Sequence, residues 1–296
     1  RYYEREHGAC IFSMPLMCDL CPRQCKVNRA IGEVGFCGAT DNSIKISRAA
    51  LHFWEEPCIS GTRGSGAVFF SHCSLKCVYC QNIEISRGIS GAEVSIVRLA
   101  EIMLEMQAQG AHNINLVTPT HYVNHIIAAL DIAKSRGLHL PIVYNTGGYE
   151  MPSVIEKLRG YVDIFLTDYK YANNTDAAKY SAANNYVEYA DASLEKMVEI
   201  APLGFEEVTA ETTEGVSSPV QIMKSGVIVN IGSVTGVVQA STTTCNVTGV
   251  SGGRSNVNNG AVRAVSTSGH AYANGISADD SQNFADVYAY TSGNFR

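Results

Sequence analysis

Short apolar runs alternate with segments of helical periodicity between residues 67 and 200. In the helical segments apolar side chains recur three and four positions apart, which is typical of amphipathic helices. Gly110 and Gly137 follow the first two of these segments, where glycine favours a helix end. We predict strands at 67–70, 114–117, 141–144 and 162–166, helices at 97–109, 121–136 and 151–159, and a further helix that includes 194–200. Buried strands that alternate with helices predict a parallel sheet covered by helices.

A fifth strand is expected at 226–229, and the pattern then changes. Leu203 is the last leucine, and residues 231–296 contain no Lys, Glu, Pro, Met or Leu. Ser, Thr, Gly and Asn supply 32 of those 66 residues. This composition departs strongly from that of ordinary domains. We therefore expect an atypical tail at 231–296 which, if ordered, is rich in strands and loops.

Charge and hydropathy exclude several function classes. The formal net charge is −6, so no global positive field would attract nucleic acid or an anionic membrane. No apolar run reaches the roughly 18 residues of a membrane helix. Residues 1–10 contain no signal-peptide core. We predict a cytoplasmic protein that binds neither nucleic acid nor a membrane.

Nine of the ten cysteines fall between Cys10 and Cys80, in close-spaced groups. This distribution favours metal ligands in a reducing compartment over a disulfide scaffold. Cys73, Cys77 and Cys80 directly follow the strand at 67–70, and loops after parallel strands form the active face. Three thiolates leave one iron of a [4Fe–4S] cluster without a protein ligand. The alternative is zinc, for which the adjacent His72 would have to be the fourth ligand.

The spacing C-x3-C-x-aromatic-C after a first strand resembles the radical S-adenosylmethionine superfamily. Longer strings resemble the pyruvate formate-lyase activating enzyme-related family within it, over roughly residues 10–200. They are CDLCPRQC at 18–25, GFCGA at 35–39, AALHFWEEPC at 49–58, NLVTPTHY at 115–122 and YNTGGYE at 144–150.

The resemblance implies an α/β fold, a partial (βα)6 barrel of the TIM-like radical S-adenosylmethionine type. We expect three parts: an N-terminal Cys-rich extension at 1–60, the barrel at 61–230 and the tail at 231–296. The implied activity is that of an iron–sulfur oxidoreductase which reductively cleaves S-adenosylmethionine to a 5′-deoxyadenosyl radical. Activation of a glycyl-radical enzyme is the implied use, with that enzyme as protein substrate and flavodoxin or ferredoxin as electron donor.

The resemblance also assigns site residues. The cluster ligands would be Cys73, Cys77 and Cys80, and S-adenosylmethionine would bind the fourth iron. Tyr79 would lie on the adenine side, and Lys170, oriented by Asp168, would neutralise the cofactor's carboxylate. The remaining cofactor-binding candidates are Thr118, His121 and Asn145. The sequence identifies no catalytic residue beyond these.

A second cysteine group has the spacing C-x2-C-x3-C-x11-C. Four thiolates can hold a structural zinc ion or an auxiliary iron–sulfur cluster, although free thiols also fit the spacing. Its members are Cys18, Cys21, Cys25 and Cys37, while Cys10, Cys58 and Cys245 have no assignable partner.

Two departures from the family pattern lie at the cluster loop. His72 stands where a Gly is usual, and Ser74 where an Asn is usual, so we expect a strained backbone at His72. No strand–helix unit is recognisable after residue 229, so either the tail replaces the last unit of the barrel or the sequence is chimeric, frameshifted or artificial. Two other functions stay open: a non-catalytic iron–sulfur or zinc protein with a degenerate barrel, and a binding protein with an extracellular-type β module in the tail.

Overall fold

A computed structural model describes most of the chain and gives the fold directly. The described ranges are 17–201, 204–211, 217–231, 234–240, 244–249, 257–258, 262–266, 270–274, 282–283 and 287–291. Cys10 lies outside them. Within these ranges, no helix combines the length and the apolar character that a bilayer crossing requires.

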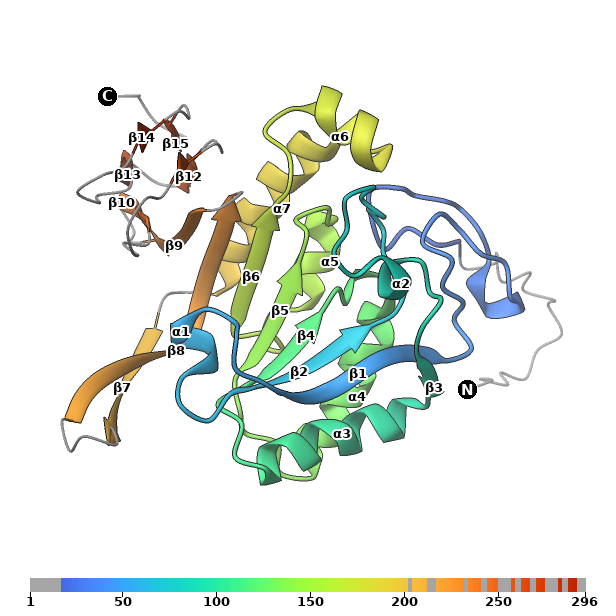
Figure 1. Ribbon diagram of the computed structural model, residues 1–296. Coiled ribbons are helices and arrows are strands. Elements are labelled where there is room, and N and C mark those ends of the chain that lie inside the picture. The colour runs from blue at the N-terminus through green and yellow to red at the C-terminus, as the bar shows by residue number, and fades with distance from the viewer. Residues whose placement is uncertain are drawn as a thin grey trace, which may run out of the picture.

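The centre of the molecule is a twisted, mostly parallel sheet (Figure 1). Seven strands form it in the order β8-β6-β5-β4-β2-β1-β3. The pairs from β2 to β8 are parallel, and β1 pairs antiparallel with both β2 and β3. The bounds are β1 Ile44–His52, β2 Ser65–Phe70, β3 Ala92–Val94, β4 Ile114–Val117, β5 Ile142–Thr146, β6 Ile164–Tyr169 and β8 Ser217–Ile231.

The sheet continues past β8 without closing. Strand β9 pairs antiparallel with β8, β10 and β13 extend the sheet further, and β7 pairs with the N-terminal part of β8. None of the described strands joins β3 to the other end, so the predicted α/β partial barrel is confirmed as an open one. The bounds of these strands are β7 Gly204–Glu211, β9 Val234–Ala240, β10 Thr244–Gly249 and β13 His270–Asn274. The other described strands form two separate parallel pairs, β11 Val257–Asn258 with β14 Gln282–Asn283 and β12 Val262–Ser266 with β15 Val287–Thr291.

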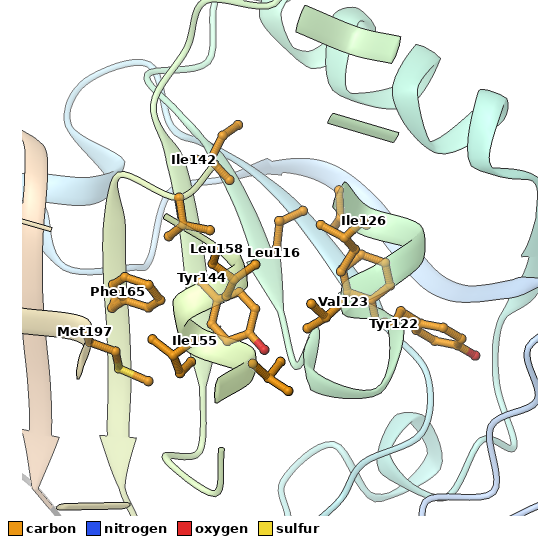
Figure 2. Packing of buried hydrophobic residues seen from close by; sticks show 14 of the residues in the cluster. Leu116, Tyr122, Val123, Ile126, Ile142, Tyr144, Ile155, Leu158, Phe165 and Met197 are labelled. Carbon is orange, nitrogen blue, oxygen red and sulfur yellow. The ribbon is translucent and has the colours of Figure 1, made fainter. Parts of the chain in front are cut away.

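Helices cover one face of the sheet. Their apolar side chains form the main core with alternate residues of β2 to β6 and β8. Figure 2 shows Tyr144 and Phe165 of this sheet face packed with Ile155 of α5 and Met197 of α7. The helices are α1 Pro57–Ser60, α2 Ile83–Ser86, α3 Ile96–Ala108, α4 Val123–Ser135, α5 Pro152–Lys157, α6 Asn174–Ser181 and α7 Tyr186–Ile200, with 3-10 turns η1 Arg29–Ile31 and η2 Thr120–Tyr122.

The opposite, inner face of the sheet has its own small apolar cluster. Ile59 of the short helix α1 packs there against Val143, Ile164, Leu166 and Ile228. Figure 1 shows α1 lying in front of the strands, on the side away from α3 and α4. The inner face is therefore filled at the level of this cluster.

The predicted elements are confirmed, with shifted bounds. Ser95 caps α3 by accepting a hydrogen bond from the Arg98 backbone N–H, and Gly110 beyond its end has φ +87°. The helix expected from His121 begins instead with the 3-10 turn η2, and α4 starts at Val123. The strand expected at 226–229 is the C-terminal part of the longer β8. Sequence reasoning missed β1 and β3, and the division into three parts stays a prediction.

Candidate functional site

A cavity of about 420 Å³ lies at the carboxyl ends of the parallel strands. Its walls come from the loops after β2, β4, β5 and β6, where parallel α/β folds place their active sites. The structure brings eight predicted residues to these walls: Cys73, Tyr79, Cys77, Cys80, Thr118, Asn145, Asp168 and Lys170.

The cysteine loop is shaped by two residues in the left-handed region. His72, directly before Cys73, has φ +77°, and Lys76, directly before Cys77, has φ +49°. The strained backbone expected at His72 is thus confirmed, because a side chain there opposes this conformation. The His72 N–H donates to the carbonyl of Ile85 at 2.8 Å, and the His72 ring fills the space that a Cβ at Gly88 would need.

The three loop thiols lie close enough to act on one another. Burial raises the pKa of Cys73, and the neighbouring Cys77 and Cys80 raise it further, while N–H groups of Lys76 and Leu75 lower it. The Leu75 N–H lies 3.3 Å from the Cys73 Sγ. Burial and mutual repulsion both raise the thiol pKa. A positively charged metal centre would lower the thiol pKa again, because metal binds the deprotonated thiolate.

The donor set fits an iron–sulfur cluster better than a single ion. In the part of the chain that the structure describes, no group of three or more His, Cys, Asp or Glu side chains converges as for one metal ion. The loop instead offers three soft sulfur donors, an N–H group directed at one of them, and an adjoining cavity. Three thiolates beside open space suit a cluster whose fourth iron takes a non-protein ligand.

Lys170 and Asp168 form an ion pair on the cavity wall after β6. Their Nζ and Oδ2 atoms are 2.6 Å apart. Burial alone would lower the pKa of Lys170. The Asp168 carboxylate acts in the opposite direction, and the net pKa is raised, so the ammonium stays charged. The Lys170 N–H donates to the Tyr186 hydroxyl at 2.7 Å, and that hydroxyl donates to the Gly147 carbonyl at 2.8 Å. Tyr186 thereby fixes the loop after β6 to the loop after β5.

Thr118 and Asn145 lie side by side at the ends of β4 and β5. The Thr118 N–H donates to the Asn145 carbonyl at 2.9 Å, and Thr118 has φ +59°. Gly147 follows, and a Cβ there would lie 2.9 Å from Leu75 of the cysteine loop. The chain after β5 thus lies against the Leu75 side chain, which would have to shift if a side chain replaced Gly147.

His121 lies behind the cysteine loop and is not among the residues that line the cavity. Its imidazole is buried, and its Nε2 donates to the Ser71 carbonyl at 2.7 Å. Burial lowers the pKa of His121 to about 3, so the ring is neutral. In this position His121 supports the start of the cysteine loop, and its role as a cofactor acceptor stays a prediction.

Glu150 is a buried carboxyl beneath the cavity that sequence reasoning missed as a site residue. It accepts hydrogen bonds from Thr120 at 2.6 Å, from Tyr144 at 3.3 Å, and from Thr146. Thr120 and Thr146 also line the cavity. Burial raises the pKa of Glu150 to about 7, and the hydrogen bonds moderate the shift. The residue belongs to the YNTGGYE string, but no local pattern reveals that a charged side chain is fully buried.

The second cysteine group packs outside the cavity. Burial raises the pKa of Cys21 to about 12, with contributions from Glu150, Cys37 and Cys25. None of the four thiols lines the cavity, although their mutual effects show that they are neighbours. A Cβ at Gly35 would lie 2.7 Å from the Cys25 Sγ, so the chain passes close to this thiol.

Two arginines attach this segment to the rest of the fold, and one of them, Arg23, reaches the cysteine loop. The Arg23 Nε donates to the Ser74 carbonyl at 3.0 Å, and its other nitrogens donate to the carbonyls of Ser181 and Ala182. The buried Arg29 donates to the His121 carbonyl at 2.7 Å. The second group therefore supports the loop from outside.

The comparisons with known proteins agree with this site. Residues 67–213 match the model of the radical S-adenosylmethionine superfamily, and the match contains the cysteine loop and all the strands around the cavity. These residues are therefore similar to radical S-adenosylmethionine domains. The chain is also 30% identical, over 178 residues, to an uncharacterized protein of Methanocaldococcus jannaschii. That alignment covers 57% of this chain and 50% of the relative, so the chain spans about half the length of the curated relative it matches.

Proposed function

We propose that the chain is a radical S-adenosylmethionine enzyme that reductively cleaves S-adenosylmethionine to a 5′-deoxyadenosyl radical. The observation that supports this most is the position of Cys73, Cys77 and Cys80 on one wall of a cavity, with the Asp168–Lys170 pair on another. The three thiolates would hold a [4Fe–4S] cluster, which when bound supplies the electron for the cleavage.

The other cavity residues suit the cofactor's polar groups. The Lys170 ammonium would bind the carboxylate, and Asp168 holds that ammonium in place. The Asn145 side chain and the backbone around Thr118 would take the amino group and the ribose, and Tyr79 would flank the adenine. Phe69 and Val117 are apolar residues of the cavity lining and would limit water around the bound cofactor.

Activation of a glycyl-radical enzyme is the more specific function that we propose. It requires a macromolecular substrate and a protein electron donor such as flavodoxin or ferredoxin. In support, Val78, Tyr79, Ile83 and Ile89 around the cysteine loop are large hydrophobic residues exposed to solvent. Exposed apolar side chains are typical of protein contact surfaces, and Val78 and Tyr79 lie between Cys77 and Cys80 in the sequence.

The test is anaerobic reconstitution with iron and sulfide, reduction, and measurement of 5′-deoxyadenosine formed from S-adenosylmethionine. We expect turnover that disappears in Cys77→Ala. A reconstituted, reduced protein that binds iron and sulfide but forms no 5′-deoxyadenosine would contradict the enzyme function. It would support a non-catalytic iron–sulfur protein instead.

A further inference from the structure

The cavity adjoins a group of tyrosine rings that the proposed function leaves largely unused. Tyr149, in the loop after β5, lines the cavity and is only 3% exposed. Its ring stacks on that of Tyr186 in α7, with 5.9 Å between the ring centroids and an interplanar angle of 21°. The ring of Tyr189, further along α7, lies edge-on to Tyr149 at 6.4 Å. The group therefore begins at the cavity wall and continues into the protein.

Tyr186 lies at the centre of this group. Its ring also contacts the rings of Tyr169 and Tyr171, with centroid distances of 5.7 and 5.2 Å and interplanar angles of 83° and 90°. Tyr171 in turn contacts Tyr79 of the cysteine loop at 6.1 Å. The ring of Tyr79 also contacts that of Tyr180 in α6, at 6.2 Å. A continuous series of ring contacts thus joins the loop after β5 to the cysteine loop.

The group contains tyrosine alone, and we call it the tyrosine network. Its members are Tyr79, Tyr149, Tyr169, Tyr171, Tyr180, Tyr186 and Tyr189. They are seven of the 15 tyrosines of the chain, and no ring contact among the described residues joins them to a Phe, Trp or His ring. Phenylalanine, of which the chain has nine, packs as well as tyrosine does, so packing alone does not require seven hydroxyls. What tyrosine adds is a phenolic hydrogen atom that an oxidant can remove.

The buried hydroxyls of the network have fixed hydrogen-bond partners. The Tyr169 hydroxyl donates to the Asp191 carboxylate at 2.6 Å, so a base is in place to take its proton. The Tyr149 hydroxyl donates to the Asn185 Oδ1 at 2.6 Å. The Tyr186 hydroxyl donates to a backbone carbonyl, which is a weak base. The Tyr186 ring is therefore suited to pass an electron between its neighbours rather than to hold a radical.

Three members of the network reach the surface. Tyr79 is 52% exposed, and Tyr180 and Tyr189 are half-buried, whereas Tyr149 is almost completely buried. A reductant in solution can therefore reach the first three rings. Because electron transfer between aromatic groups slows steeply with distance, a series of rings in contact divides a long transfer into short, fast steps. The network thus connects the cavity with the surface.

We propose that the tyrosine network carries an oxidising equivalent out of the cavity when the 5′-deoxyadenosyl radical has no substrate to attack. The inference rests on the proposed function for the source of the radical, but conduction through the network is a property of the chain alone. A cavity in which a strong oxidant forms needs such an outlet, because the radical otherwise attacks the protein around it.

The first step is transfer of the phenolic hydrogen atom of Tyr149 to the radical. The O–H bond breaks and a C–H bond forms at the 5′ carbon, which leaves 5′-deoxyadenosine and a neutral tyrosyl radical. An electron from another ring of the network and a proton from water then restore Tyr149. The ring that is oxidised releases its own proton, Tyr169 to Asp191 and the half-exposed rings to water. A thiol in solution finally gives a hydrogen atom to a half-exposed tyrosyl radical, and two thiyl radicals combine to a disulfide.

Photo-oxidation tests conduction without any cofactor. Flash-generated tris(bipyridyl)ruthenium(III) takes one electron from exposed rings of the full chain, and Trp54→Phe removes the competing tryptophan, which is 89% exposed. Tyr79 then loses an electron to the complex and a proton to the buffer. Without a thiol, radicals confined to the surface are lost as dityrosine cross-links between chains, whereas radicals that move to buried rings persist. We therefore expect electron paramagnetic resonance to show a persistent tyrosyl signal.

Tyr171→Phe interrupts the network between Tyr79 and Tyr186 but keeps a ring at that position. In the Trp54→Phe chain this change should lower the persistent signal severalfold and increase dityrosine. Tyr161→Phe is the matched control, because the Tyr161 hydroxyl donates to Asp131 outside the network, and it should leave the signal unchanged.

Turnover in deuterium oxide tests whether the reaction uses the network. Phenolic hydrogens exchange with solvent, whereas carbon-bound hydrogens do not. The reconstituted protein, reduced with dithionite and given S-adenosylmethionine without substrate or thiol, should therefore form 5′-deoxyadenosine that carries one deuterium. Mass spectrometry should show that Tyr149→Phe lowers the labelled fraction severalfold, while Tyr161→Phe leaves it unchanged.

The two measurements separate the inference from the proposed function. Circular dichroism checks that the variants are folded. An equal persistent signal with and without Tyr171→Phe would overturn conduction and the inference with it. Unlabelled 5′-deoxyadenosine from wild type, or an equal labelled fraction in Tyr149→Phe, would show that the network is not the outlet. If no 5′-deoxyadenosine forms at all, the proposed function fails, and photo-oxidation still decides whether the network conducts.

Discussion

Both cysteine groups have the spacing of metal ligands in the sequence, but the structure places them differently. Cys73, Cys77 and Cys80 line the cavity at the carboxyl ends of parallel strands. The N-terminal thiols pack outside it, and burial raises the pKa of Cys21 to about 12. The spacing of cysteines therefore identifies thiols that can lie close together. The fold determines which of these groups lies at the cavity. The cavity group can serve a reaction, and the outer group can serve the loop that carries it.

Loss of one cavity thiol should have the largest effect. Cys77→Ala should abolish the [4Fe–4S] absorption after anaerobic reconstitution, because two thiolates cannot replace three as ligands. Cys21→Ala should retain that absorption, since Cys21 does not line the cavity. Optical spectra with iron and sulfide analysis measure both. If both variants lost the cluster equally, the distinction between the groups would fail.

Glu150 lies between the two groups and should make stability depend on pH. Its pKa is raised from 4.5 to about 7, so between these values the folded protein holds a proton that the unfolded chain has released. The stabilisation is complete below about pH 4.5 and is lost as pH rises through 7, by up to about 3 kcal/mol.

Urea unfolding of the apoprotein at pH 5, 6, 7 and 8 measures this effect. Because the lowered pKa of His121 acts in the opposite direction, the variant provides the comparison. As pH rises, the free energy of unfolding of wild type should fall relative to that of Glu150→Gln. Glu55→Gln serves as a comparison, because the pKa of Glu55 is raised into the same range. If the free energy of unfolding depended on pH in the same way in Glu150→Gln and wild type, Glu150 would not be a source of the pH dependence.

Lys170→Ala should weaken binding of S-adenosylmethionine by about 1.5–3 kcal/mol, the usual range for a charge-assisted contact. The cluster should stay intact, because Lys170 is not a ligand. Lys157→Ala, on the exposed part of α5, is the control and should bind normally. Equilibrium dialysis with the reconstituted protein gives both affinities, and an unchanged affinity in Lys170→Ala would place the cofactor's carboxylate elsewhere.

Arg23→Ala tests whether the segment with the second cysteine group stabilises the cysteine loop. We expect this variant to have the smallest effect. Arg23 donates to carbonyls of the cysteine loop and of the end of α6, and its guanidinium lies 3.8 Å from the Phe36 ring centroid. Because the site is partly exposed, we expect a loss of about 1–2 kcal/mol in the free energy of unfolding. Arg23→Lys should recover part of it. Full stability in Arg23→Ala would show that the outer segment does not support the loop.

The sequence predicted the parallel core and the cavity thiols because both depend on local patterns. Strands such as β4 are short apolar runs, and the helices after them repeat every three to four residues. Strand β1 was missed, although Ile44 and Ile46 alternate with polar residues, because the prediction followed the βα pattern alone. The antiparallel pairing of β1 with β2 has no such signature.

The contacts that sequence reasoning missed join distant segments. Arg23 meets Ser74 across 51 residues, and its bond to Ser181 spans 158. Similarly, the environment of Glu55 comes from β4 and β6, which no motif around residue 55 reveals. Burial of Glu150 and Asn115 is likewise a property of packing. Local motifs thus predicted the ligands, and only the fold shows what surrounds them.

The most direct test of the central claim is electron paramagnetic resonance of a chain in which Cys18, Cys21, Cys25 and Cys37 are all replaced by Ser. After reconstitution and reduction this variant should show a [4Fe–4S] signal from the cavity thiols alone. Addition of S-adenosylmethionine should change that signal, because the cofactor binds the cluster at the open cavity. A variant without a cluster signal, or with one that S-adenosylmethionine leaves unchanged, would contradict the assignment of the cavity as the site.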